Sequence, residues 1–266
     1  MPMTIKGLSE RELNLRVAWE RQNRRLVTLR ELRGELGSAA YNVASRLEHK
    51  GILSRVGRGV YAVRPLRSIG RPHSVSPLAA AAVAVGDEDY YCGGLGVLNL
   101  HRLTEQYYPG RVDLFSGRRR KPKLLAGAQI HFHLAPASDL VFGVEETTID
   151  GVKVRISDPE RTVLDLLEHP HLAGGVAEAI KIVTPVISKV EAGRLVRYAL
   201  KLARPTTCRR LGLLLERTGA PRQTWRPLLK SVQRAAHGAA FVPDAPKRGA
   251  YSTRWRLSVN DVEVGS

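Results

Sequence analysis

The stretch TLRELRGELGSAAYNVASRLEHKGILSRVGRGVYAV, residues 28–63, decides the fold of the N-terminal part of this 266-residue chain. Its apolar residues recur at helical spacing on both sides of Gly37, which predicts two helices joined by a tight corner. Two short apolar segments, 52–56 and 60–63, follow with glycines between them and predict a hairpin. The order of elements therefore indicates a helix-turn-helix with a wing. The expected inward-facing residues are Leu29, Leu32, Leu36, Ala40, Val43, Ala44 and Leu47.

The second of these helices carries polar side chains on the face away from its apolar stripe. Asn can bond adenine and Arg can bond guanine in the major groove, whereas arginines of a wing can meet phosphates or a minor groove. We expect Ser38 to cap this helix. An ordinary small helical domain with a solvated face is the alternative. The expected DNA-contacting residues are Ser38, Ala39, Tyr41, Asn42, Ser45, Arg46, His49, Lys50, Arg55 and Arg58.

The composition is that of a globular protein. A hydrophobic content of 43% is enough for a core, and the length suits one large or two medium domains. Cys92 and Cys208 are too few for a disulfide framework or a zinc site. We find no signal peptide and no apolar run of membrane-spanning length, and we expect a cytoplasmic protein.

The net charge of +17 is distributed unevenly along the chain. Residues 1–71 carry 15 Lys/Arg against 6 Asp/Glu, and residues 181–256 carry 17 against 3. The intervening residues 72–180 are slightly acidic, with 10 against 14. Two basic regions indicate a polyanionic partner, although a basic surface without such a partner is the alternative.

The sequence predicts a mixed α+β fold with two domains. We expect a winged helix-turn-helix at residues 1–71, a linker within 64–76, and a larger domain at 77–266. A sheet region at about 77–156 precedes a basic helical region at about 157–266. The expected helices are 9–22, 77–85, 92–100, 175–183, 188–203, 206–218 and 224–236, and the expected strands include 111–116, 129–134, 140–148, 152–156 and 251–257.

Several residues could carry chemistry, but simpler explanations account for them. His131 and His133 share a strand face without an evident third ligand, so we expect no metal. The glycine-rich run GGLGVLNLHRLTEQ lacks the lysine and spacing of a phosphate-binding loop. Ser157 and Glu160 form a capping-box pattern at the start of a helix, and Arg161 and Asp165 are spaced to pair. We therefore expect no catalytic residues and no cofactor.

Other basic residues outside the recognition helix and wing are candidate phosphate contacts. They lie at the end of the first helix, at a hairpin tip, and in the C-terminal helices. They are Arg24, Arg25, Arg118, Arg119, Arg120, Lys201, Arg204, Arg209 and Arg210.

Three segments together resemble the AbiEi antitoxins of type IV toxin–antitoxin systems. They are the wing LSRVGRGVYAV, the segment YYCGGLGVLNLHRLTEQ, and SDPERTVLDLLEHPHLAGGVAE, in the same order as in the family. The resemblance implies a DNA-binding domain that represses its own operon at inverted repeats in double-stranded DNA. It also implies a C-terminal domain that neutralises a nucleotidyltransferase-like toxin, without necessarily binding it. The family's DNA-contacting positions correspond to residues 38–50 and 55–58.

Two other functions are compatible with parts of the sequence. A restriction-endonuclease-like nuclease delivered by the winged helix needs an acid and an acid-x-lysine pair to hold magnesium. The segment Asp150-Gly151-Val152-Lys153 has the wrong spacing for that pair, and the C-terminal part has few acids. A stand-alone regulator without a toxin differs only in its genomic neighbourhood. The leading hypothesis is an autorepressor that is also an antitoxin.

Overall fold

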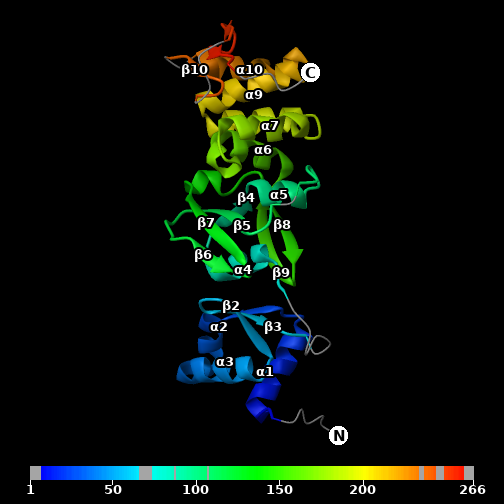
Figure 1. Ribbon diagram of the computed structural model, residues 1–266, viewed down its shortest axis with the longest axis vertical. Coiled ribbons are helices and arrows are strands. Elements are labelled where there is room, and N and C mark those ends of the chain that lie inside the picture. Colours follow the sequence, from blue (N-terminus) through cyan, green and yellow to red (C-terminus); the bar gives the residue numbers. More distant parts are fainter. Residues whose placement is uncertain are drawn as a thin grey trace. The chain divides into compact units, whose positions relative to one another are not determined.

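The structure is a computed structural model, in which residues 7–65, 74–86, 88–106, 108–233, 237–243 and 249–260 are described (Figure 1). Its contacts divide the chain into two units that are each discontinuous in sequence. Unit 1 consists of Met1–Cys92, Pro109–Leu140 and Glu146–Arg155, and unit 2 consists of Gly93–Tyr108, Val141–Glu145 and Ile156–Ser266. Both helices and strands are present throughout, which confirms the mixed α+β class. Much of the expected linker lies outside the described residues, and the domain boundary at 71–77 stays a prediction.

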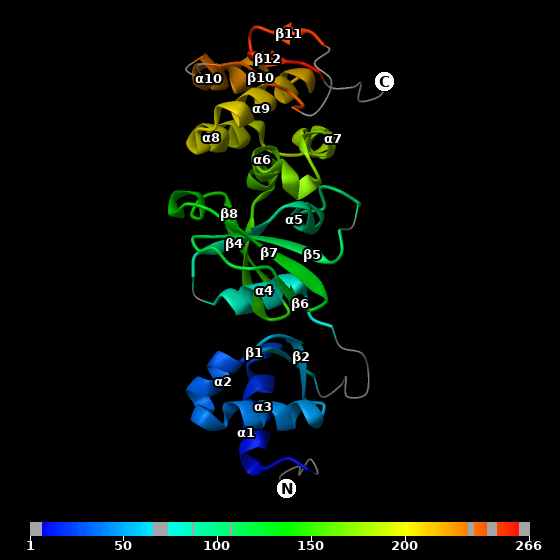
Figure 2. The ribbon, with the colours of Figure 1, turned by 60° about the vertical axis from the view of Figure 1, so that its left-hand side comes forward.

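The N-terminal part of unit 1 is a winged helix (Figure 2). Its elements are α1 (Glu10–Arg21), β1 (Leu26–Thr28), α2 (Leu29–Leu36), the 3-10 turn η1 (Gly37–Ala39), α3 (Ala40–His49), β2 (Leu53–Gly57) and β3 (Val60–Val63). The expected helix-turn-helix and wing are therefore confirmed. The sheet has three strands in the order β1-β3-β2. Strand β1 was not expected, because three residues are too short to show an alternating pattern.

One apolar cluster holds these helices together. Leu32, Val43 and Leu47 are buried in it, as expected, and Trp19 of α1 joins them. Ser9 and Glu12 form the reciprocal capping box at the start of α1. The prediction that Ser38 caps α3 is wrong: η1 occupies the corner, and no side chain caps α3 at Ala39.

A six-stranded sheet follows in the strand order β6-β7-β5-β4-β9-β8. Helix α4 (Pro77–Val85) packs against β5, β6 and β7. Strands β5 and β7 run parallel, with Arg111 opposite Gln129. The strands are β4 (Tyr90–Gly93), β5 (Arg111–Ser116), β6 (Lys123–Leu125), β7 (Ala128–Leu134), β8 (Val144–Ile149) and β9 (Val152–Ser157).

The expected helix at 92–100 is only partly correct. Residues Tyr90–Gly93 form the buried strand β4, and α5 (Leu95–Leu100) starts after Gly94, whose φ is +74°. A short, fully buried strand has no polar alternation, so sequence periodicity cannot distinguish it from a buried helix. The strands expected at 111–116 and 129–134 are confirmed as β5 and β7.

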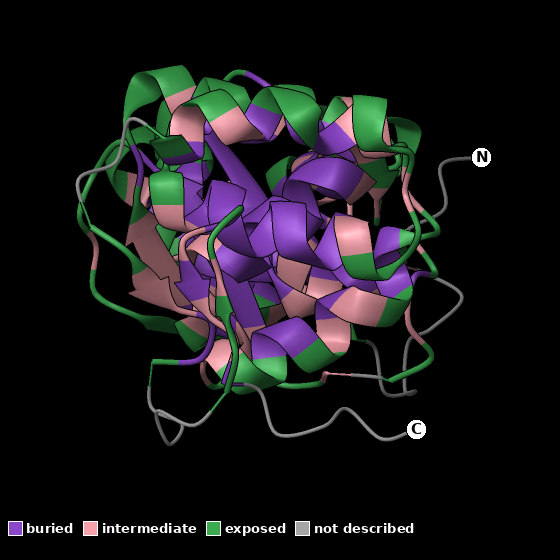
Figure 3. Cartoon of the chain, turned by 90° about the horizontal axis from the view of Figure 1, so that it is seen from above, coloured by how far each residue is buried: buried purple, intermediate pink, exposed green. Residues whose placement is uncertain are grey.

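Unit 2 is built around α6 (Pro159–Glu168), in which every residue from Glu160 to Leu167 is buried. It contacts α5, α7 (Val176–Ile187), α8 (Ala192–Leu202) and α9 (Pro205–Arg217). Figure 3 shows how purple, buried segments and green, exposed segments alternate along the helices. Helix α10 (Arg222–Gln233) packs on α8 and α9. The four helices expected at 175–183, 188–203, 206–218 and 224–236 are thus present as α7 to α10, with ends that differ by a few residues from those expected.

The C-terminal segment closes against α9. Instead of one strand at 251–257, β11 (Tyr251–Ser252) and β12 (Leu257–Ser258) pair on either side of a turn, and β10 (Ala239–Ala240) pairs with β12. The turn buries Trp255 completely. Its ring occupies the space beside Gly212 of α9, so a Cβ added at Gly212 would lie 2.0 Å from the ring. Only glycine fits at this crossing.

Replacing Gly212 should therefore destabilise unit 2. We expect Gly212→Ala to lower the free energy of unfolding by about 1–3 kcal/mol, because the methyl group displaces a fully buried indole. The measurement is the urea midpoint of the full chain. Gly34→Ala is the control: Gly34 lies in α2 with open space around its Cα, so alanine should leave stability unchanged or increase it. Equal midpoints for the two variants would contradict this packing.

Candidate nucleic-acid interface

Helix α3 presents a continuous polar face outside the core. Ala40, Val43, Ala44 and Leu47 are buried, which places the remaining positions outward at helical spacing. The side chains of Tyr41, Asn42, Arg46, His49 and Lys50 are exposed, as is Ser38 in η1, while Ala39 and Ser45 are half-buried. Tyr41 is 61% exposed, although it is a large hydrophobic residue. The face therefore combines hydrogen-bonding groups with an accessible aromatic ring.

The wing carries two exposed arginines. Strands β2 and β3 pair antiparallel, with an irregularity between Arg55 and Gly57. Gly59 has a φ of +73°, a conformation that favours glycine at this turn. Arg55 Nε donates to the Gly57 carbonyl at 3.4 Å, whereas the structure shows no bond for exposed Arg58 within its described residues. Both arginines are thus accessible, as the expected contact with DNA requires, and the contact itself stays a prediction.

A contact that local sequence patterns did not reveal joins α1 to α3. Glu12 is 1% exposed, and its carboxylate forms ion pairs with two cationic side chains of the recognition helix. Arg46 Nε lies 3.0 Å from Oε1, and Lys50 Nζ lies 2.6 Å from Oε2. The backbone amide of Ser9 also donates to Oε2 at 2.9 Å. Thus two expected DNA contacts, Arg46 and Lys50, are ion-paired to the neighbouring helix.

These bonds keep Glu12 ionised. Burial alone would raise the pKa of this carboxyl group, but hydrogen bonds from Lys50, the Ser9 amide and Arg46 outweigh burial and lower the pKa from 4.5 to about 2. The carboxylate is therefore a permanent negative charge beneath the recognition helix at neutral pH.

The cations near the start of α2 are arranged differently from the expectation. Arg24 forms ion pairs with Glu31 and Glu35, and Arg25 is half-buried. By contrast, Arg30 and Arg33 on α2 are exposed. Sequence reasoning passed over these two arginines, although their spacing of three residues places them on one helix face.

The other candidate phosphate contacts divide into exposed and buried residues. Arg118 and Arg120 both pair with Glu88, at 3.0 and 2.5 Å, and Arg119 is exposed. In unit 2, exposed Lys201 lies over the Phe142 ring, and Arg204 pairs with Glu168.

Arg209 and Arg210 contradict the expectation that they contact phosphate. They are 3% and 7% exposed, and they donate to the backbone carbonyls of His237 and Phe241. Because α9 lies between other helices and the C-terminal segment, its charged residues are inside. They stabilise the fold of unit 2 and are not surface cations.

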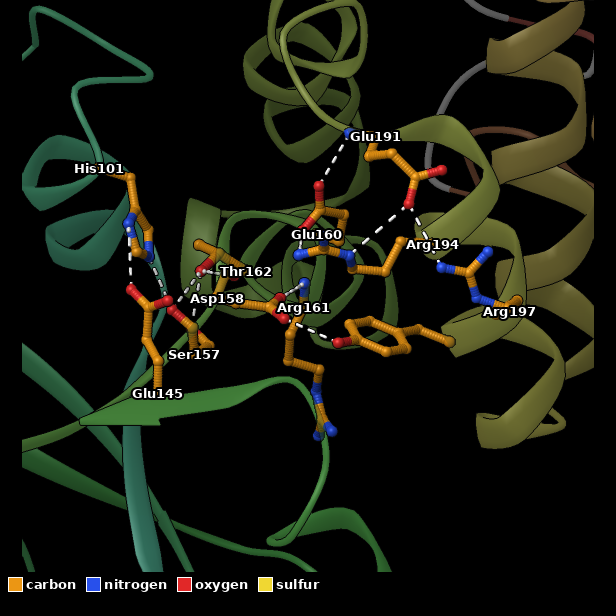
Figure 4. Close-up of polar contacts among 11 residues, drawn as sticks. His101, Glu145, Ser157, Asp158, Glu160, Arg161, Thr162, Glu191, Arg194 and Arg197 are labelled. Carbon is orange, nitrogen blue, oxygen red and sulfur yellow. Dashed lines mark hydrogen bonds and ion pairs between the residues drawn. The ribbon is translucent and has the colours of Figure 1, made fainter.

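The acids that could suggest an enzyme are engaged in a network around α6 (Figure 4). Asp158, and not the expected Ser157, caps α6 by accepting the Arg161 amide at 2.7 Å, and it also accepts the Tyr198 hydroxyl at 2.8 Å. Burial and this bond raise the pKa of Tyr198 to about 12. The network therefore anchors α8 to the start of α6.

Glu160 and Asp165, the other two acids considered as catalytic candidates, also have structural partners. Glu160 accepts the Glu191 amide at 2.8 Å and pairs with Arg194 at 3.4 Å, so it is not the reciprocal cap that the sequence predicts. Asp165 forms the expected pair with Arg161, at 2.8 Å. Figure 4 shows Glu160 directed toward Glu191 and Arg194. Their arrangement is explained by helix packing.

The described ranges of residues include neither a metal-binding cluster nor a membrane-spanning helix. There, no three His, Cys, Asp or Glu side chains gather as a metal centre would need. His133 is instead bonded to Asp113, at 2.8 Å. No helix within these ranges is both long and apolar enough to cross a membrane.

Lowering the pH should remove the stabilisation that Glu12 provides. Because its folded-state pKa is about 2, below the ordinary 4.5, the contribution is complete above pH 4.5 and is lost as the pH falls toward 2. We expect Glu12→Gln to lower the free energy of unfolding at pH 7 by about 2 kcal/mol relative to wild type, measured by urea denaturation. This difference in free energy should be smaller at pH 2.5. The pKa of Asp113 is also lowered, but Asp113 is present in both proteins, so its contribution cancels in the difference between wild type and Glu12→Gln. A pH-independent difference would contradict the assignment.

Comparisons with known proteins agree with the geometry of the winged helix. Residues 17–64 match the family model of the "Transcriptional regulator, AbiEi antitoxin". No curated protein matches the chain. The crystal structure of RV2827C protein from Mycobacterium tuberculosis is similar, with a TM-score of 0.61 and 14% identity over 94% of this chain and 91% of that chain. This similarity shows a shared fold. The family match, which runs from α1 past the end of β3, confirms the resemblance of the winged helix to AbiEi transcriptional regulators.

Proposed function

We propose that this protein is a sequence-specific DNA-binding repressor of its own operon and the antitoxin for a nucleotidyltransferase-like toxin. The observation that carries the proposal is the exposed polar face of α3, which lies within the segment that matches AbiEi regulators. The recognition helix of a helix-turn-helix enters the major groove, and its outward side chains contact base edges.

Individual residues take distinct roles in this complex. Asn42 is exposed on α3 and can bond adenine in a bidentate manner, while the exposed end of Arg46 can bond guanine. Arg58 at the wing tip meets the phosphate backbone or minor groove. Exposed Arg30 and Arg33 fit the role of the first helix of the motif, which crosses the backbone.

The basic surface of α10 supports a second phosphate contact, within unit 2. Trp225, Leu228 and Val232 face the core, and Arg222, Arg226 and Lys230 are exposed at four-residue intervals. The helix contains no acid, and the structure shows no ion pair for these three cations within its described residues. Neighbouring cations of this row are about 6 Å apart along the helix axis, close to twice the ~3.4 Å rise per phosphate of one DNA strand.

The toxin-directed part of the proposal rests on the AbiEi resemblance. We assign neutralisation to the C-terminal domain expected at 77–266, and the toxin partner is functional without necessarily being physical. A nuclease is less well supported, because Asp158, Glu160 and Asp165 already bond to the helices around them. Those acids would have to leave structural partners to hold magnesium.

Footprinting on the protein's own upstream DNA tests sequence recognition. We expect protection of inverted repeats at moderate salt. Asn42→Ala should reduce affinity for the repeat by about 1–3 kcal/mol, because it loses a base contact, with little effect on unrelated DNA. Arg58→Ala should weaken binding to all sequences about equally, because it loses a phosphate contact. Absence of any protected site, or equal losses on both DNAs for Asn42→Ala, would contradict the proposal.

A salt series tests the surface of α10. We expect the triple variant Arg222→Gln, Arg226→Gln and Lys230→Gln of the full chain to have a shallower dependence of log K on log salt. The expected change in slope is about 2.7, from roughly 0.9 per lost phosphate contact.

The control for the α10 variant keeps the charge. Arg222→Lys combined with Arg226→Lys should retain the wild-type slope, because point charges suffice for phosphate attraction. If the neutral triple variant also retains the slope, α10 does not contact DNA, and its basic face serves another partner.

A further inference from the structure

One buried carboxylate serves two cations of the recognition helix. Glu12 belongs to α1 and is separated by 34 and 38 residues from its partners Arg46 and Lys50. Both partners are expected DNA contacts, yet both point part of their polar groups inward to the same acid. The arrangement needs an explanation beyond stability, since burying a charge is costly and well-packed apolar residues often serve as well.

The contact orients the guanidinium of Arg46. Its Nε is bonded to Glu12, while the side chain remains 55% exposed. The structure shows no bond of its two terminal Nη atoms to any described residue, so this end is presented outward. A guanidinium that is bonded at Nε still offers the two Nη donors as a planar fork for guanine or phosphate. Fixing the side chain before binding reduces the rotamer entropy that is lost on binding.

The same contact lowers the charge of the surface. Arg46 and Lys50 carry two positive charges, and the ionised Glu12 beneath them compensates one. Attraction to phosphates is independent of sequence, and its strength follows the number of uncompensated cations. Glu12 therefore weakens binding to arbitrary DNA while it orients the side chain that distinguishes bases.

We propose that Glu12 is a specificity-determining positioning residue, which aims Arg46 at base edges and restrains the sequence-independent attraction of the recognition helix. The inference rests on the proposed DNA-binding function and deepens it. Glu12 does not touch DNA itself; it acts through Arg46 and Lys50.

The test compares the affinities of the full chain for its own upstream repeat and for a scrambled duplex, across a salt series. We expect Glu12→Gln to bind scrambled DNA more tightly and to discriminate about tenfold less between the two DNAs. Its salt slope should be steeper by about one, because one more cation is uncompensated. Unchanged discrimination and slope in a folded Glu12→Gln variant would overturn the proposal.

Glu20→Gln is the matched control. Glu20 lies on the same helix as Glu12, and replacing it with glutamine removes the same negative charge. However, Glu20 pairs with Arg16 of α1 and not with a residue of α3. We expect this variant to keep the wild-type discrimination. If Glu20→Gln lowers discrimination as much as Glu12→Gln, the effect is one of net charge, and the proposal is wrong.

A second variant keeps the test decisive if Glu12→Gln does not fold. Arg46→Lys changes an exposed side chain, retains its charge, and lacks both the Nε donor and the fork. We expect lower discrimination with an unchanged salt slope. Where Glu12→Gln does fold, adding it to Arg46→Lys should cause no further loss of discrimination. Wild-type discrimination by Arg46→Lys would overturn the proposal, because Glu12 would have no fork to orient.

The experiment also separates this inference from the function on which it rests. If wild type does not distinguish the repeat from scrambled DNA, the proposed function fails. If wild type discriminates and both Glu12→Gln and Arg46→Lys discriminate equally well, only the role of Glu12 fails.

Discussion

The winged helix depends on how α3 is held, with one side in the core and the other available to a ligand. Val43 and Leu47 anchor the helix through apolar contacts, which fix its rotation because no other face could be buried. Glu12 then fixes the polar side by bonding Arg46 and Lys50. Apolar packing and one buried ionic contact together determine which atoms face outward. The proposed reading of DNA follows from this constraint.

The sequence was sufficient to predict elements whose signals are local. Helical spacing across Gly37 predicted the helix-turn-helix, and the cap of α1 also follows a local pattern, a serine three residues before a glutamate. The second role of Glu12 could not be predicted, because its partners are more than 30 residues away. Arg209 and Arg210 were misplaced for a related reason: a basic helix resembles a surface helix until the segment that covers it is known. Strand β4 was missed because full burial removes alternation.

Unit 2 uses its charges in two ways. Around α6, acids and bases are bonded to each other and to helix termini, as Asp158 is to Tyr198 and Glu160 is to the Glu191 amide. On α10, by contrast, Arg222, Arg226 and Lys230 share an exposed face opposite buried Trp225. Net charge alone could not separate these uses. For this reason the proposed phosphate contact of unit 2 lies on α10 and not on α9.

The central claim is that the exposed face of α3 recognises a particular DNA sequence. The most direct measurement is the ratio of affinities of the full chain for its own upstream DNA and for a shuffled duplex of the same length, at one physiological salt concentration. The account predicts a preference of at least about 10³-fold, as is typical of specific DNA-binding proteins. Equal affinities for the two duplexes would contradict it, and would leave only a general attraction between a basic protein and a polyanion.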